Sequence, residues 1–339
     1  MPRADASPRR PVGWYAHHSG AGHVTRATLV AAGMESVVTI LSSAPRPDHW
    51  PANRWVCLPD DSGPGGGDHE AGGALHWAPT DHSGYRERMA ALARWIGRHR
   101  PALLVVDVSV EVTLLSRLLG VPTVVTLMAG DRTDGPHRAG YDAASALVAA
   151  WPALAGEAPV TGFRDAWRDK TTYAGAFSRF DHLAPVPPPG ARHVTVLWGA
   201  GRSDETRVRV RAAQAATPRW RWTSCEGLAP ADLWARLQSA DVVVTHAGQN
   251  ALAEVAAASR PAVVLPQPRP HDEQNHLARA LTRLGVTEVA PDWPAPWQWE
   301  GLLESRLAAG TPEWSRWNDG RGARRLTDHL DALAAQWSP

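Results

Sequence analysis

The sequence has few cysteines: only Cys57 and Cys225 occur in a chain of 339 residues. Two distant cysteines exclude a disulfide scaffold and a cysteine-based zinc site, and they favour a reducing compartment. The sequence also lacks any apolar run near the ~18 residues of a membrane span, and no signal-peptide core follows its basic N-terminus. We therefore expect a cytoplasmic protein with no transmembrane segment.

An excess of charge is also missing. The chain has 35 basic and 34 acidic residues, a formal net charge of +1. With no basic helix and no basic strip interleaved with aromatics, the sequence gives no argument for nucleic acid as a partner. A composition of 44% hydrophobic and 20% charged residues is typical of a globular protein. The length exceeds that of a single core, so we expect two domains.

Short apolar runs alternate with helical patterns along the first half of the chain. We expect strands at 12–16, 36–41, 103–108 and 122–127, and helical segments from 20–26 and over 85–99 and 111–119. Residues 60–73 are so rich in glycine that we expect a flexible loop that does not pack. The stretch 185–190, PVPPPG, reads as a stiff linker, and a new strand is expected at 194–198. This alternation predicts an α/β fold with parallel, doubly wound sheets.

The segment 240–275 is the most informative part of the sequence. A β-branched strand at 242–244 is followed by His246 and Gly248 at its carboxyl end, where open α/β sheets bind ligands. Asn250 is expected to cap the next helix, whose N-terminus favours a phosphate, with Glu254 about one turn further on. After another strand and a proline-rich loop, a second polar cluster spans 272–275. An ordinary βαβ unit is the simpler interpretation, but two adjacent polar strand ends favour a nucleotide-sugar site.

This segment resembles the donor-binding region of GT-B glycosyltransferases, in particular the family 28-like group that contains the peptidoglycan N-acetylglucosaminyltransferase. The shared signature is His-x-Gly-x-x-(Thr)-x-x-Glu. The chain departs from it at Asn250 and Ala251, where the family often has Ser or Thr. The resemblance implies phosphate contacts from the start of the helix, ribose contacts from Glu254, and contacts with the donor sugar from the second cluster. The implied donor-binding residues here are His246, Gly248, Gln249, Asn250, Glu254, Asp272, Glu273 and Gln274.

The resemblance also implies the layout of the whole chain: two Rossmann-like domains whose parallel sheets face each other across a cleft. We expect a disordered N-terminus at 1–11 and an acceptor-side domain at 12–184. The linker at 185–190 is then followed by a nucleotide-sugar-binding domain at 191–313. A C-terminal helical segment at 314–339 is expected to return to the first domain.

The glycine-rich loop within 16–27, AHHSGAGHVTRA, is the second informative motif. Gly20 and Gly22 allow a sharp turn and a close approach of backbone N–H groups to a ligand. The form Gly-x-Gly-His-x-x-Arg resembles the first loop of the same group and of a related group of nucleotide-sugar hydrolases. We expect His23 to be the catalytic base, with His17 and then His18 as the next choices. A structural role for His23 remains the alternative.

Further candidates follow other strands. Asp107 and Glu111 could orient a histidine or deprotonate an acceptor, or Asp107 and Ser109 could simply cap a helix. His18, Glu111 and the polar residues at 130–137 are expected on the acceptor side, although a solvated loop also explains the last group. A glycine loop after 194–198 is expected near the donor phosphates. The candidates in these last two loops are Asp131, Arg132, Asp134, His137, Gly201, Arg202 and Ser203.

Together these observations predict an inverting, metal-independent glycosyltransferase that moves a sugar from a UDP- or dTDP-linked donor to a hydroxyl group. No metal site or cofactor is expected, because a helix dipole, a histidine and an arginine can stabilise the leaving diphosphate. The acceptor is left open between a small molecule and a lipid-linked one, and the seventeen tryptophans leave open a peripheral membrane contact. A nucleotide-sugar hydrolase and an inactive nucleotide-sugar-binding partner protein remain alternatives.

Overall fold

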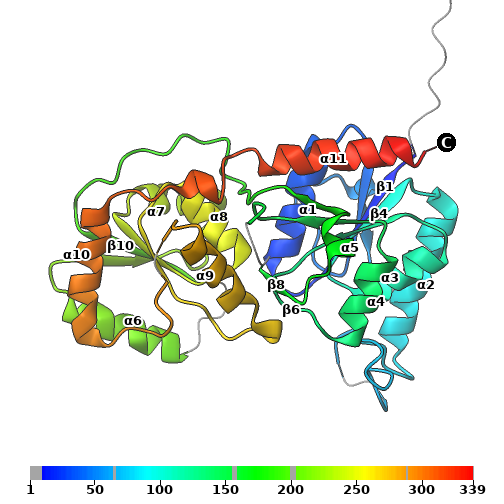
Figure 1. Cartoon of the computed structure of the whole chain (residues 1–339), viewed down its shortest axis with the longest axis horizontal. Helices are drawn as coiled ribbons and strands as arrows, with labels where there is room; N and C mark the ends of the chain where they lie inside the picture. Colours follow the sequence, from blue (N-terminus) through cyan, green and yellow to red (C-terminus); the bar gives the residue numbers. More distant parts are fainter. Residues whose placement is uncertain (1–9, 64–65, 155–158, 199–203, 288, 339) are drawn as a thin grey trace, which may run out of the picture.

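The computed structural model of the chain describes residues 10–63, 66–154, 159–198, 204–287 and 289–338. These residues form two lobes, each built on a parallel sheet flanked by helices (Figure 1). The α/β class with parallel sheets is therefore confirmed. No helix in the described ranges combines the length and apolar character that a membrane crossing requires.

The sheet of the first lobe has the strand order β3-β2-β1-β4-β5-β7-β9 among the described residues. The strands are β1 (Val12–Ala16), β2 (Val38–Ser42), β3 (Trp55–Cys57), β4 (Leu103–Asp107), β5 (Thr123–Thr126), β7 (Ala146–Ala149) and β9 (Thr171–Tyr173). The central strands β1, β4 and β5 are short apolar runs buried throughout, as parallel strands covered by helices must be. The strand order reverses between β1 and β4, so the loops that follow these two strands border a crevice.

Helices on both faces cover this sheet (Figure 1). They are α1 (Ala21–Gly33), α2 (Ser83–His99), α3 (Val110–Leu118), α4 (Gly135–Ala143) and the short α5 (Asp165–Arg168), with a 3-10 turn, η1, at Ala52–Arg54. A separate two-stranded pair, β6 (Gly130–Asp131) and β8 (Val160–Thr161), lies on the side of this lobe that faces the second lobe. The sequence places the start of the lobe at Val12, but Arg10 already donates hydrogen bonds to the carbonyl oxygens of Arg100 and Pro101.

The second lobe contains a four-stranded parallel sheet of order β11-β10-β12-β13 among the described residues. Its strands are β10 (His193–Leu197), β11 (Arg221–Ser224), β12 (Val242–Thr245) and β13 (Ala262–Val264). Its helices are α6 (Asp204–Ala216), α7 (Pro230–Gln238), α8 (Gln249–Ala257), α9 (Glu273–Arg283) and α10 (Trp299–Ala309), with 3-10 turns η2 (Pro270–Asp272) and η3 (Pro296–Gln298). The reversal between β10 and β12 places the β12–α8 loop at the crevice of this sheet.

The last helix, α11 (Gly322–Gln336), crosses back and packs on α1 of the first lobe (Figure 1). Leu326, Leu330 and Ala334 are buried in the core that α1 shares with the first sheet. The hydroxyl of Thr327 also donates to the Val30 carbonyl oxygen at 3.1 Å. The expected helical segment from 314 is wrong in its first part. Residues 314–321 contain only the 3-10 turn η4 (Trp314–Arg316) before α11 begins.

Two other local expectations are wrong. Helix α8 begins at Gln249 with Gly248 as its N-cap, so Asn250 lies inside the first turn and does not cap the helix. The loop at 60–73 packs in part: Asp61 is buried, and its carboxylate lies 2.8 Å from the guanidinium of Arg88. The reason is electrostatic, because Arg88 is itself buried and requires a counter-charge.

Arg260 is fully buried and ties the linker to the second lobe. Its guanidinium donates to the carbonyl oxygens of Leu237, Val186 and Gln238 at 2.8–3.0 Å. We expect Arg260→Met to destabilise the protein by about 3 kcal/mol or more, because several buried carbonyls lose a charged donor. Urea denaturation followed by circular dichroism measures this loss. Arg219→Met, which removes an exposed arginine, is the matched control, and equal stability of the two variants would contradict the prediction.

Candidate active site

The two sheets direct the carboxyl ends of their strands toward the space between the lobes. The loops after β1 and β4 come from the first lobe, and those after β12 and β13 from the second. Most of the residues expected to bind or react with a substrate lie on these four loops. Their side-chain contacts decide which of these residues lie next to one another.

His23 and Asp107 form a hydrogen-bonded pair. His23 lies in the first turn of α1, and its Nδ1 is 3.1 Å from Oδ1 of Asp107 at the end of β4. Arg26, one turn further along α1, places Nε 3.4 Å from the other oxygen of Asp107. Burial raises the pKa of the fully buried Asp107 carboxyl, but the charges of Arg26 and His23 outweigh it and lower the pKa below its ordinary value. An ionised Asp107 accepts from Nδ1–H, which leaves Nε2 of His23 free to take a proton.

After β4, one residue caps helix α3 and another holds a neighbouring loop. Ser109 caps α3, because its hydroxyl accepts from the Val112 backbone N–H at 3.1 Å. Asp107 is therefore not needed as a cap. Glu111, which was expected on the acceptor side, accepts from the backbone N–H groups of His76 and Trp77 and from the Ser109 hydroxyl. Its carboxylate holds the loop at 76–77 in place.

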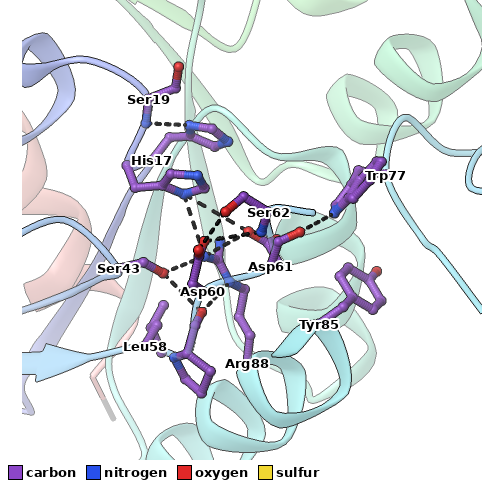
Figure 2. A network of polar contacts seen from close by, with 12 residues as sticks. His17, Ser19, Ser43, Leu58, Asp60, Asp61, Ser62, Trp77, Tyr85 and Arg88 are labelled. Atoms are coloured by element: carbon purple, nitrogen blue, oxygen red, sulfur yellow. Dashed lines mark hydrogen bonds and ion pairs between the residues drawn. The ribbon is translucent and has the colours of Figure 1, made fainter. Parts of the chain in front are cut away.

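The other two histidines of the first loop lie beside a buried polar network. Arg88 lies at its centre: it donates to the Tyr15 hydroxyl and the Pro59 carbonyl oxygen and pairs with the Asp61 carboxylate. Figure 2 shows Arg88 beside Asp61 and Ser43. The His18 ring stacks on His17 and lies 3.4 Å from Arg88. Burial and the neighbouring His18 and His23 lower the pKa of His17 to about 4. His17 is therefore neutral at pH 7, and its Nδ1 accepts from the Ser19 backbone N–H.

In the second lobe, His246 is arranged as a hydrogen-bond donor. Burial, with a smaller effect from Arg269, lowers the pKa of His246 to about 4, so the ring is neutral at pH 7. Its Nδ1 accepts from the Gly248 backbone N–H at 2.9 Å, and the remaining proton therefore resides on Nε2. A Cβ added at Gly248 would collide with this ring, so the position requires glycine. An Nε2–H donor at the start of a helix suits a phosphate oxygen.

The first turn of α8 reaches the first lobe. A Cβ placed on Gly22 would lie 2.9 Å from the side-chain nitrogen of Asn250, so the two loops are in contact. Gln249, beside it, has both amide atoms buried without a hydrogen bond to any described residue. Buried amides nearly always have partners. The unpaired amide of Gln249 therefore indicates a place for a ligand at this junction.

Gln274 joins the two loops of the second lobe. Its side-chain oxygen accepts from the backbone N–H groups of Ala247 and Gln267, at 3.0 and 2.9 Å. This leaves the NH₂ group to contact a ligand. Asp272, in contrast, accepts from the Asn275 side chain on the outer turn of α9 and is exposed.

Glu273 faces the first lobe. Burial raises the pKa of its carboxyl, while the positive charges of Arg132 and Arg26 oppose the rise. The backbone of Glu273 also lies against the first lobe, since a Cβ at Gly130 would come within 3.2 Å of the Glu273 Cα atom. Residues that the sequence assigns to opposite domains thus meet here.

Glu254 has a partner that the sequence does not reveal. Its carboxylate is nearly buried and lies 2.8 Å from Nη2 of Arg179, which follows the first lobe's last strand. Burial raises the pKa of Glu254, and Arg179 opposes that rise. Any ribose that bonds to Glu254 must share this carboxylate with Arg179 or displace it.

The segment 130–137 lies against the second lobe. Gly130 has a φ of 113°, and a Cβ there would collide with the carbonyl oxygen of His271, so only glycine fits. Arg132 is buried and donates to the Ala129 carbonyl oxygen and to His137. Asp131 is exposed and accepts from Thr133. The segment therefore lies at the junction of the two lobes, whereas the sequence alone places it only on the acceptor side.

Three expected donor residues, Gly201, Arg202 and Ser203, lie outside the described residues. Sequence reasoning also missed residues that the structure brings to the site: Arg26, Arg179, Arg269, His76 and His271. Arg26 was visible as the last residue of the Gly-x-Gly-His-x-x-Arg motif. The others had no local signal, because their partners lie far away in the sequence.

Comparison with known proteins agrees with this geometry. Residues 196–297, most of the second lobe, match the model of the glycosyltransferase family 28 C-terminal domain. A curated relative is the UDP-N-acetylglucosamine--N-acetylmuramyl-(pentapeptide) pyrophosphoryl-undecaprenol N-acetylglucosamine transferase of Rubrobacter xylanophilus. It is 44% identical over 62 residues, and the aligned segment spans only 18% of this chain and 18% of that protein.

Solved structures resemble nearly the whole chain. MurG of Acinetobacter baumannii is 16% identical and has a TM-score of 0.57 over 97% of this chain and 100% of that one. CalG4, the calicheamicin glycosyltransferase, is 18% identical, with a TM-score of 0.60 over 98% and 100%. UGT2 of Phytolacca americana, complexed with UDP-2fluoro-glucose and pterostilbene, is 12% identical, with a TM-score of 0.60 over 96% and 99%.

The chain therefore has the GT-B fold of glycosyltransferases, as its sequence predicts. Within that class it resembles the peptidoglycan N-acetylglucosaminyltransferase group, and the family 28 match lies in the second lobe.

The pair Glu254–Arg179 gives a test of the ribose assignment. Glu254→Gln should weaken binding of the preferred nucleoside diphosphate, UDP or dTDP, by about 1–3 kcal/mol, because a charged acceptor is lost. Arg179→Gln removes the same ion pair but leaves the carboxylate, so it should weaken binding less. Titration calorimetry of both variants measures the difference. An equal loss in the two would mean that the ion pair, and not a ribose contact, carries the effect.

Proposed function

We propose that this protein is an inverting glycosyltransferase that transfers a sugar from a nucleoside-diphosphate donor to a hydroxyl group of an acceptor. The observation that carries the proposal is the meeting of two groups at the junction of the lobes. The first lobe supplies an oriented His23–Asp107 pair, and the second supplies a helix N-terminus with a neutral His246. A base and a diphosphate site facing each other are what displacement at an anomeric carbon requires.

The donor would lie along the second lobe. Its diphosphate would accept from the free N–H groups at the start of α8, from Nε2–H of His246 and from the Gln249 amide. The ribose would bond to Glu254, and the sugar would contact Glu273 and the NH₂ group of Gln274. UDP is favoured as the nucleotide, because the Phytolacca americana structure binds a UDP-sugar and the Rubrobacter relative is named for one.

The acceptor would lie against the first lobe. A groove of about 920 Å³ runs beside α1, from His18 and Gly20 to Trp50, and Arg179 also lines it. Its walls are mostly alanine, valine, leucine, proline and tryptophan side chains, which suits an acceptor with an apolar body. The acceptor hydroxyl would be placed at Nε2 of His23.

The chemistry would proceed in one displacement. Nε2 of His23 takes the proton as the acceptor oxygen forms its bond to the anomeric carbon. The bond from that carbon to the diphosphate oxygen breaks at the same time, which inverts the configuration. Asp107 stabilises the imidazolium that forms. Helix α8 and His246 stabilise the negative charge that develops on the leaving diphosphate, so no metal ion is needed there.

Substitutions at the proposed base should lower the rate of the chemical step without changing the affinity for the donor. We expect His23→Ala and Asp107→Asn to lower kcat by about 10²–10⁴ while donor affinity stays within about twofold, because neither residue contacts the diphosphate. Steady-state kinetics and calorimetric titration of the nucleotide measure the two effects. His99→Ala, on the outer end of α2, is the matched control. Full activity in both variants would mean that His23 is not the base. Donor binding without turnover in the wild type, with every acceptor tested, would instead favour an inactive nucleotide-sugar-binding protein.

The donor and the reaction type can be tested together. A thermal-shift panel of UDP, dTDP, GDP and their common sugars should identify one nucleotide, since a ligand of the native state raises the melting temperature. Turnover of that donor should need no added Mg²⁺ or Mn²⁺ and should be nearly silent without an acceptor. Fast donor hydrolysis in water alone would instead identify a nucleotide-sugar hydrolase. If no nucleotide raises the melting temperature at millimolar concentration, the donor site is misplaced.

A further inference from the structure

Three histidines and one aspartate gather at the junction of the lobes, outside the proposed donor and base residues. They are His76, Asp134, His137 and His271, and each offers one nitrogen or oxygen atom within 4.8 Å of the others. His76 Nε2 lies 3.2 Å from Oδ1 of Asp134, and His137 Nδ1 lies 2.6 Å from Oδ2. His271 Nδ1 is 3.9 Å from that second oxygen. The three histidine side chains therefore converge on the Asp134 carboxylate.

The cluster is assembled from three separate segments and from both lobes. His76 comes from the loop before α2, and Asp134 and His137 come from the start of α4. His271 comes from η2, which directly precedes the donor-sugar candidates Glu273 and Gln274. The backbone at His271 is left-handed, with a φ of 59°, and it approaches Gly130 so closely that a side chain there would not fit.

Local structure explains only part of this arrangement. Asp134 caps α4, because its carboxylate accepts from the His137 backbone N–H at 2.8 Å. That role requires neither His76 nor His271. The rings are also in mutual contact: His137 lies 4.3 Å from His76 and 4.8 Å from His271 between ring centroids. Three imidazoles around one carboxylate form a common donor set for zinc, whereas hydrogen bonding to a single aspartate would satisfy only one or two of them.

The geometry is close to what zinc needs. A tetrahedral Zn²⁺ ion with bonds of about 2.0–2.1 Å holds its ligand atoms about 3.4 Å apart, so the cluster must contract by roughly one ångström. Arg132 contacts His137 at Nε2, the nitrogen that faces away from Asp134. Coordination through Nδ1 would leave the ring proton on Nε2, so Arg132 would turn away and keep its bond to the Ala129 carbonyl oxygen.

A second group, His18, Asp60 and Asp61, also has ligand atoms close together. There the guanidinium of Arg88 already lies 2.8 Å from Asp61 and 3.4 Å from His18. At this second site a guanidinium already pairs with the carboxylate, whereas at the first site Arg132 contacts the His137 ring and not Asp134.

We propose that His76, Asp134, His137 and His271 bind one zinc-type divalent cation that links the two lobes. Because three ligands belong to the first lobe and one to the second, the ion would favour the closed arrangement of the cleft. It would also fix the turn η2, which leads directly into the start of α9 with Glu273 and Gln274. The ion is separate from the diphosphate site at α8 and takes no part in the displacement.

The test is metal binding to the full-length protein after treatment with a chelator. Titration with Co²⁺ alone, followed by its visible absorption, reports tetrahedral coordination, and competition with Zn²⁺ gives the affinity. We expect one ion per chain. His76→Ala, Asp134→Asn, His137→Ala and His271→Asn should each weaken binding by about 100-fold or more, since the loss of an outer-shell partner alone costs 10–100-fold.

The substitutions are chosen to preserve the fold. Asn at 134 keeps an oxygen that can cap α4, and Asn at 271 tolerates the left-handed backbone that alanine would not. His69→Ala removes a histidine that lies in the same loop as His76 and packs beside the Trp77 ring, and it serves as the matched control. Melting temperatures measured in chelator should agree for the wild type, His271→Asn and His69→Ala.

Two results would overturn the proposal. One is the absence of saturable, stoichiometric Co²⁺ or Zn²⁺ binding to the wild-type chain. The other is wild-type affinity in His271→Asn, which would mean that the ion does not link the lobes. In the proposed arrangement, Zn²⁺ raises the melting temperature of the wild type and of His69→Ala but not of His271→Asn. This readout needs no donor, so it is independent of the proposed transferase activity.

Discussion

The site depends on how closely the backbones of the two lobes approach each other. Gly22 meets the Asn250 side chain, and Gly130 meets the carbonyl oxygen of His271, with no room for a Cβ at Gly130. These contacts bring the hydrogen-bonded side chains of His23, the proposed catalytic base, and Asp107 opposite the start of α8. A larger residue at Gly130 would meet backbone atoms and push the lobes apart, whereas at Gly22 it would meet only the end of the Asn250 side chain, which can turn aside. The reacting groups of the proposed displacement could not tolerate such a gap, so Gly130 would act on catalysis through distance rather than through flexibility.

Much of the fold could be predicted because its central strands carry a strong local signal. The runs that became β1, β4 and β12 are short, mostly apolar and buried, β12 being wholly β-branched, and turns or helical patterns follow each of them. The prediction that the loop at 60–73 does not pack was wrong. The interaction that holds it joins Asp61 to Arg88, and only the fold brings these two residues together. The N-cap of α8 was placed two residues late, at Asn250 instead of Gly248, because a side chain that can cap a helix does not do so where a glycine already provides the turn.

Strand ends select some candidates for the site from the sequence alone: His246 follows β12 directly, and Asp107 ends β4. It was not predictable where a partner comes from the other lobe. Lys170 is the only lysine of the chain, so arginine supplies almost every positive charge and no single arginine stands out in the sequence. Arg179 and Arg132 become candidate site residues only once the structure shows their interactions with Glu254 and Glu273. The histidine cluster is hidden for the same reason, since its members lie on three segments and no regular spacing connects them.

The closed junction buries polar atoms that the described residues leave unpaired: the Gln249 amide, Nη1 of Arg26, Nε of Arg132 and Nε of Arg179. Each such group costs about 1–3 kcal/mol when it is buried without a partner. Closure without a ligand is therefore unfavourable at this place. A diphosphate with its sugar offers many acceptor oxygens to these donors, and a cation at the histidine cluster would offset part of the same cost. Donor binding and closure are then linked, so the base would meet a donor mainly when water has been excluded from the junction.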